Sequence, residues 1–179
     1  MRALIQRVSR AALVVRGPGA ASSDDLAAHP GRVAVGRGLV VLVGVGRDDA
    51  DGDPERLAAK IAELRIFEDD AGKMNRSVRD VAGSILAVSQ FTLHADCRKG
   101  NRPSFGDAAR PEVARPRFAA LVAGLRARGI EVLTGVFGAD MEVEIVNDGP
   151  VTIALDTREL GGAATRDRRA ESSAQDPGA

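Results

Sequence analysis

The chain lacks tryptophan and tyrosine altogether, and five phenylalanines supply its whole aromatic content of 3%. Since 44% of its 179 residues are hydrophobic, a folded core is still expected, and it must be built from aliphatic side chains. Only one cysteine, Cys97, is present, which excludes an internal disulfide and fits a reducing compartment such as the cytoplasm. The longest apolar run, residues 39–45, is broken by Gly44, and the first residues lack a signal-peptide pattern. We therefore expect no membrane segment.

Neither sign of charge is in excess, because 25 basic residues stand against 25 acidic ones. A surface for nucleic acid would therefore need local clustering of charge. Histidine is limited to His29 and His94, and no HExxH, CxxC, Gly-x-Ser-x-Gly or Walker-type pattern occurs. A metal site needs about three or four ligands at suitable spacing. We therefore expect neither a metal nor a cofactor.

Cys97 follows His94 closely in the sequence, which raises the possibility of a cysteine nucleophile with a histidine base. Such a pair needs a spatial geometry that closeness in sequence does not provide. The favoured interpretation is an incidental cysteine in a polar loop.

Apolar periodicity predicts one domain of mixed α and β structure over residues 1–157, followed by a disordered tail over residues 158–179. Residues 17–33 have the composition of a loop. Helices are expected from Asp53, as N-cap before Pro54, and from about Arg115-Pro116 to a stop at Gly129. Strand patterns cover residues 4–8, 11–15, 33–45, 85–91, 130–133, 141–145 and 151–155. A turn at Ser9-Arg10 is expected to join the first two. The third contains an apolar run that suits a strand buried on both faces.

The segment Ser89-Gln90-Phe91-Thr92 ends an apolar strand. Three hydrogen-bonding side chains gather where this strand emerges from the core. Polar groups at such a place must face water, a ligand or a local backbone group. Taken alone, the pattern favours the last of these, a strand end that satisfies its own backbone.

The segment Asn147-Asp148-Gly149-Pro150 lies between two alternating strand patterns and is by itself a turn signal. Glycine before proline permits unusual backbone angles, and the bond before proline is the only common context for a cis peptide.

Together these motifs belong to a larger pattern. Seven segments, in order along the chain, resemble the D-aminoacyl-tRNA deacylases, the D-tyrosyl-tRNA(Tyr) deacylase family. They are residues 1–9, 38–45, 64–69, 72–78, 89–93, 98–105 and 147–152. The resemblance covers most of residues 1–157. It departs from the family in the longer 17–33 segment, in His94 where an aromatic residue is expected, in Asp140 at the pocket rim, and in the tail.

The resemblance implies an α/β fold of layered antiparallel, barrel-like sheets with helices on one side. It implies a homodimer with active sites at the subunit interface, and hydrolysis of the ester of D-aminoacyl-tRNA. Carried over to this sequence, Ser89, Gln90, Phe91 and Thr92 line the pocket. Gly149-Pro150, with a cis bond, enters the partner's pocket as a gate against L-amino acids. Such a gate would also pass glycyl-tRNA, including glycine mischarged on tRNA(Ala).

The missing catalytic triad is consistent with this chemistry. An aminoacyl ester is already activated, so an enzyme mainly needs to orient it and to stabilise the oxyanion. Thr92 could act as a nucleophile, but no base is evident near it in the sequence. A positioning or oxyanion role is therefore favoured, with backbone N–H groups near Phe91 and Thr92 as oxyanion donors.

A basic segment follows the pocket motif. Residues 98–117 hold six basic and two acidic side chains, a local charge of +4. We expect Arg98, Lys99 and Arg102 to contact tRNA phosphates, which would position the acceptor end without selecting for its sequence. Two alternatives to the deacylase stay open at this point. One is a non-catalytic RNA-binding or dimeric module, and the other is a cysteine or threonine hydrolase acting on another ester or amide.

Overall fold

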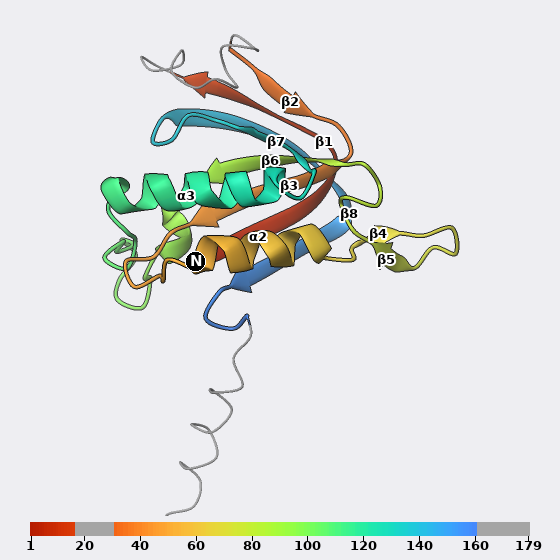
Figure 1. The fold of residues 1–179 in the computed structure, drawn as a ribbon. Helices are drawn as coiled ribbons and strands as arrows, with labels where there is room; N and C mark the ends of the chain where they lie inside the picture. Colours follow the sequence, from red (N-terminus) through yellow and green to blue (C-terminus); the bar gives the residue numbers. More distant parts are fainter. Residues whose placement is uncertain (17–30, 161–179) are drawn as a thin grey trace, which may run out of the picture.

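A strongly curved β-sheet packed against two helices forms the fold of the chain (Figure 1). The structure is a computed structural model and describes residues 1–16 and 31–160. The helices are α2 (Asp53–Glu63) and α3 (Pro111–Arg126), and a 3-10 turn, η1, covers Phe91–His94. The strands are β1 (Arg2–Arg16), β2 (Val33–Val35), β3 (Gly38–Gly44), β4 (Phe67–Glu68), β5 (Met74–Arg76), β6 (Ser84–Ser89), β7 (Glu131–Thr134) and β8 (Asp140–Asp156).

The main sheet has the order β2-β1-β3-β6-β7, and β8 pairs with β1 as well. β1 is antiparallel to β2, β3 and β8, whereas β3 pairs with β6, and β6 with β7, in parallel. β2 also approaches β6 and β7, so the sheet curls towards closure. The expected α/β fold with a barrel-like sheet is confirmed. The expectation of purely antiparallel sheets is corrected, because β3–β6 and β6–β7 pair in parallel and make the sheet mixed.

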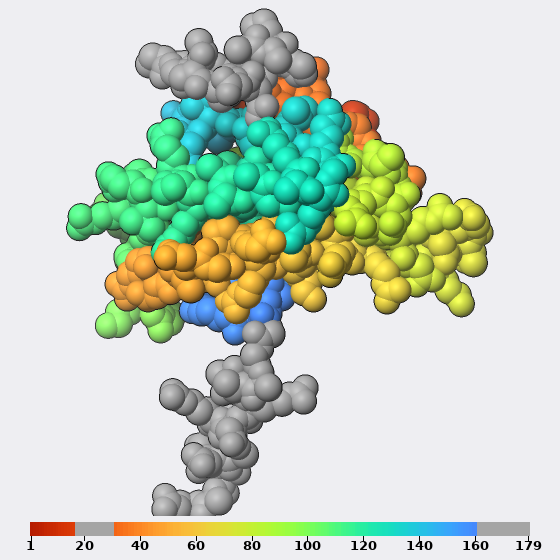
Figure 2. Space-filling model, in the orientation of Figure 1, coloured from red at the N-terminus to blue at the C-terminus, as the bar shows by residue number. Residues whose placement is uncertain are grey.

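Both helices lie side by side on one face of the sheet, as expected (Figure 1). Figure 2 shows them covering this face, while the β4–β5 hairpin projects away from the body. Their apolar residues, such as Leu57 and Leu121, form one core with the inward side chains of β3 and β6. A second core lies on the other face of the sheet, under β1, β2 and β8.

The central strands β3 and β6 are buried on both faces, as the apolar run predicted. Leu39 and Val41 belong to the core under the helices, while Val40 belongs to the other core. The two strands approach closely at Gly38, where a Cβ atom would lie 1.8 Å from the carbonyl oxygen of Ser84. Only glycine fits there.

The predicted turn at Ser9-Arg10 is wrong. β1 continues through these exposed residues and stays paired with β8, with register shifts between Gln6 and Val8 and between Val8 and Arg10. Two polar residues in a row break the alternation of a strand, and β-bulges accommodate them without ending it. The continuous β1 therefore spans both cores.

The predicted turn at residues 147–150 is also wrong, because β8 runs through it as one long strand. Gln6 pairs with Thr152 and Val8 with Asn147, so residues 148–151 of β8 bulge opposite the single residue Arg7. A proline is tolerated inside a sheet at a bulge, where no ladder hydrogen bond is required of it.

Both helices begin earlier than expected. Gly52, not Asp53, is the N-cap of α2; Asp53 is the first helical residue, and its carboxylate accepts from the N–H of Ala50 at 3.0 Å. α3 begins at Pro111 rather than near Pro116, which lies inside the helix. Proline is preferred at the first helical position, and here the earlier of two prolines takes it.

Residues 157–160 form a turn after β8, and Leu160 packs against the core. The predicted loop at 17–33 falls mostly outside the described residues, and so does the predicted disorder of residues 161–179. Within residues 1–16 and 31–160, neither helix combines the length and apolar character that a membrane crossing requires.

Candidate active site

The end of β6 opens into a cavity of about 630 Å³. Three of the predicted site residues, Ser89, Gln90 and Phe91, line it together. The other walls come from residues 105–111, which lead into α3, and from residues 137–143, which lead into β8. Asp140 lies in this second wall, so its expected place at the rim agrees with the structure. Segments distant in sequence thus meet around the predicted motif.

Thr92, the fourth predicted residue, lies in the exposed η1 turn directly after Gln90 and does not line the cavity itself. The Nε2 amide of Gln90 donates to the Thr92 hydroxyl at 2.5 Å. Within the described residues, no carboxylate or imidazole accepts the proton of this hydroxyl. The hydrogen bond from Gln90 orients the threonine oxygen.

Two backbone donors are unused at the start of η1. The N–H groups of Phe91 and Thr92 donate to no acceptor within the described residues, whereas the preceding Gln90 N–H donates to the carbonyl of Val43 at 2.7 Å. The first N–H groups of any helical turn lack an internal partner. Here they are adjacent, and Phe91 lines the cavity. Adjacent N–H groups without an acceptor, next to a cavity, are suited to binding an anionic oxygen.

Two contacts that the sequence did not reveal hold the η1 turn against β1 and the end of β3. The guanidinium of Arg2 donates to the Leu93 carbonyl at 2.8 Å. The His94 ring is buried beside Gly44 and Gly46, where a Cβ atom at either position would come within 2.9 Å of it. The Gly44-x-Gly46 spacing was the available signal, and its purpose is to admit this ring.

His94 has its pKa lowered, first because burial disfavours the charged imidazolium, while a hydrogen bond to the Gly44 backbone opposes the shift. The His94 side chain is buried and Cys97 is exposed. No hydrogen bond joins them within the described residues. The structure therefore does not assemble a cysteine–histidine pair.

Gly149 and Pro150 are exposed on the β8 bulge, and the peptide bond between them is cis. Gly149 has a φ of +131°, a conformation that side-chain-bearing residues rarely adopt. Neither residue lines the cavity of its own chain. The predicted gate and the predicted pocket are therefore separate features of the chain.

The bulge is fixed by Arg7, which is almost fully buried. Its Nε donates to the Asp148 carbonyl at 3.1 Å and lies 3.3 Å from the Asp148 carboxylate. Its terminal nitrogen donates to the Ile66 carbonyl at 2.6 Å. The guanidinium thus ties the bulge to the segment after α2.

The basic segment divides into two parts. The Arg98 guanidinium pairs with both carboxylate oxygens of Asp96 and holds the pKa of that carboxyl far below its ordinary value. Arg117 pairs with Asp51 at 2.9 Å. Lys99 and Arg102 are exposed and have no ion-pair partner within the described residues. Arg98 is therefore part of the loop's own structure, while the other two cations are available.

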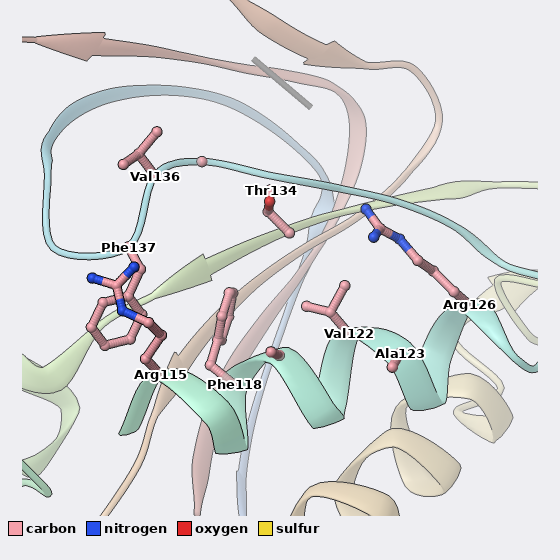
Figure 3. Close-up of a pocket in the computed structure, with 10 residues that line it drawn as sticks. Arg115, Phe118, Val122, Ala123, Arg126, Thr134, Val136 and Phe137 are labelled. Carbon is pink, nitrogen blue, oxygen red and sulfur yellow. The ribbon is translucent and has the colours of Figure 1, made fainter. Parts of the chain in front are cut away.

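A second cavity, of about 500 Å³, lies between α3 and residues 134–137 (Figure 3). Its walls are mainly apolar, and the Arg115 guanidinium stands over the Phe137 ring at 4.9 Å. It contains none of the predicted site residues. In the described part of the chain, no group of three or more metal-ligating side chains is present.

The model of the D-Tyr-tRNA(Tyr) deacylase family matches residues 4–156. The chain belongs to that family. It is therefore an enzyme of the hydrolase class, and the match includes both β6 with its motif and the β8 bulge.

Individual relatives agree with this assignment. The chain is 58% identical over 160 residues to the D-aminoacyl-tRNA deacylase of Anaeromyxobacter dehalogenans, covering 89% of this chain and 99% of the relative. It is 54% identical over 164 residues to that of Thermomicrobium roseum, covering 92% and 99%.

Among solved structures, it resembles the c-Myc DNA Unwinding Element Binding Protein, with 40% identity, a TM-score of 0.75 and coverage of 87% and 98%. A probable eukaryotic D-amino acid tRNA deacylase shares the fold, with 19% identity, a TM-score of 0.69 and coverage of 87% and 98%.

Proposed function

We propose that this protein hydrolyses the ester bond of D-aminoacyl-tRNA and thereby removes D-amino acids before translation uses them. The observation that carries the proposal is the pair of unused N–H groups of Phe91 and Thr92 beside the cavity. Water attacks the ester carbonyl, the bond to the ribose oxygen breaks, and that oxygen leaves with a proton. The products are the free amino acid and the tRNA.

The two N–H groups would stabilise the negative charge that forms on the carbonyl oxygen. Gln90 and Thr92, joined by their hydrogen bond, orient the substrate next to these donors. An activated ester requires no further nucleophile. The domain of residues 1–157 would suffice for this chemistry, and the location of charged tRNA places the reaction in the cytoplasm.

Chirality would be read by a second subunit. In this proposal the protein is a homodimer, and Gly149-Pro150 of one protomer enters the cavity of the other. The exposure of both residues and their absence from their own cavity support this arrangement. A backbone wall held by Arg7 excludes an L side chain by steric clash. Glycine has no side chain to exclude, so glycyl-tRNA is a substrate as well.

The tRNA would be held by Lys99 and Arg102, whose charges are unpaired within the described residues. Contacts of this kind bind phosphates and do not select a sequence. Arg98 serves the same surface indirectly, because its pair with Asp96 shapes the loop that carries the other two.

The function is tested by deacylation assays with D-tyrosyl-tRNA, L-tyrosyl-tRNA and glycyl-tRNA(Ala). We expect release of D-tyrosine and glycine and very slow release of L-tyrosine. Equal rates for both tyrosine enantiomers would refute the chiral gate. Binding of tRNA without release of any amino acid would favour a non-catalytic RNA-binding module instead.

The shared site is tested by co-expressing two strongly impaired variants, the double variant Gln90→Ala/Thr92→Ala and the gate variant Gly149→Ala. An added methyl at Gly149 would lie 2.8 Å from the Val151 side chain. In a mixed dimer one site combines an intact pocket with an intact gate, so co-expression should restore about a quarter of wild-type activity. No restoration would show that each chain uses its own gate.

A further inference from the structure

Two of the five phenylalanines in this chain lie together on the surface at the cavity. Phe91 is 56% exposed and Phe105 is 37% exposed. Their ring centroids are 5.0 Å apart at an interplanar angle of 73°, so one ring meets the other edge to face. This contact occupies a face of only one ring. The remaining ring faces are not covered by this contact, although the protein has few aromatic residues. Exposed aromatic faces beside a cavity suggest a binding surface.

Both rings are mounted on fixed backbone. Asp96 and Ser104 exchange two hydrogen bonds, at 2.7 and 2.9 Å, at the base of the loop before Phe105. Directly after it, the Ala108 N–H donates to the Phe105 carbonyl at 3.0 Å, and the Ala109 N–H donates to the carbonyl of Val45, the residue after β3, at 2.9 Å. These hydrogen bonds order the backbone that carries Phe105, so less of its freedom is lost when a flat ligand binds.

The charge around the cavity is unequal. Arg110 lies in the same wall as Phe105, and Lys99 and Arg102 extend from the loop that precedes it. None of the three has an ion-pair partner within the described residues. The β8 side of the cavity instead carries Asp140. These charges therefore favour entry of a polyanion along the side of the cavity that carries Phe105.

We propose that Phe91 and Phe105 form a stacking platform for the unpaired nucleotide that precedes the aminoacylated nucleotide, with Arg110 against the phosphate that joins the two. This assignment rests on the proposed function and names how the same site holds its RNA. Aromatic rings beside cations are a general means of binding unpaired bases, and stacking tolerates any base. In this arrangement the aminoacylated nucleoside occupies the cavity, and the RNA strand leaves the cavity across the two phenylalanine rings.

The test compares wild type, Phe105→Ala, Phe105→Tyr and the control Val113→Ala. Val113 is exposed at the start of α3 and does not line the cavity. Each variant is assayed on D-tyrosyl-tRNA and on D-tyrosyl-adenosine, which carries the same ester but lacks the preceding nucleotide. Phe105→Ala should raise KM for the tRNA about tenfold with little change in kcat. Its loss on the nucleoside should be much smaller, and Phe105→Tyr should resemble wild type.

Three results would overturn the platform: an equal loss on both substrates, no loss on the tRNA, or a weakened dimer in Phe105→Ala, which would make the rings a subunit contact. Binding of uncharged tRNA gives a second readout that does not depend on hydrolysis. Wild type should bind it about tenfold more tightly than Phe105→Ala does. If wild type hydrolyses neither substrate but this difference remains, the proposed function fails and the platform stands.

Discussion

Arg7 of β1 binds Asp148 of β8 and so links the two longest strands. The buried Arg7 guanidinium contacts both the backbone carbonyl and the carboxylate of Asp148. The residues are 141 positions apart in the sequence. The contact fixes the β8 bulge that presents Gly149 and Pro150. The proposed gate is therefore a rigid part of the sheet edge, and its position depends on one side chain of β1.

Replacing Arg7 with methionine should destabilise the fold and weaken chiral selection. The Asp148 and Ile66 carbonyls would lose their donor, at a cost of about 2–4 kcal/mol in total. The released bulge should lower D-tyrosine release and raise the relative rate on L-tyrosyl-tRNA. Urea unfolding and the D/L rate ratio measure the two effects. Arg10→Met is the matched control, because Arg10 pairs with Glu144 in solvent, and it should change stability by less than about 1 kcal/mol.

Thr92→Ala should slow hydrolysis without abolishing it. Removing the hydroxyl deletes a hydrogen bond with Gln90 but leaves both backbone donors intact, so a loss of about tenfold to a hundredfold in kcat is expected. The measurement is single-turnover deacylation, followed by mass spectrometry of the quenched protein. Detection of an amino acid esterified to Thr92 in wild type would establish a covalent mechanism and contradict the positioning role.

Gly38→Ala should destabilise the protein severely, while Gly36→Ala should not. The first places a methyl 1.8 Å from a backbone oxygen of β6, and the strands must separate to admit it. We expect a loss above about 3 kcal/mol in the free energy of unfolding, or no soluble protein. A methyl at Gly36 meets no atom within 4 Å, so its effect should stay within about 1 kcal/mol. Comparable stabilities of the two variants would contradict the close approach at Gly38.

His94 should make the protein less stable at mildly acid pH. Its folded pKa is lowered by burial, so below about pH 6.5 the unfolded chain takes up a proton that folded His94 does not. Stability is therefore lost as pH falls from about 6.5 towards the lower folded pKa, by at most about 1.4 kcal/mol per pH unit. Urea unfolding at several pH values should show this slope in wild type and a shallower one in His94→Phe. A steeper slope in the variant would reverse the assignment.

Cys97→Ser should leave deacylation unchanged. The thiol is exposed, whereas the His94 side chain is buried, so His94 does not serve as its base. Steady-state kcat/KM on D-tyrosyl-tRNA provides the measurement. Loss of activity in this conservative variant would return the cysteine hydrolase to consideration.

Local patterns in the sequence were sufficient to predict much of the secondary structure and the site motif. The apolar run of residues 39–43 identified a strand buried on both faces, because every position there must avoid water. The polar cluster at the end of β6 and the family resemblance located Ser89, Gln90 and Phe91, which the structure gathers in one cavity. The strand and the motif each consist of residues adjacent in the chain, so periodicity and motif suffice to find them, whereas the other walls of the cavity come from distant segments.

Other features depend on partners far away in the chain. Ser9-Arg10 and Gly149-Pro150 are turn signals locally, but pairing between β1 and β8 keeps each strand continuous and converts the signals into bulges. The slot for His94 requires β3 to lie under η1, and the burial of Arg7 requires both β8 and the segment after α2. Local composition cannot specify these positions, because their free energy comes from contacts that exist only once the sheet has closed.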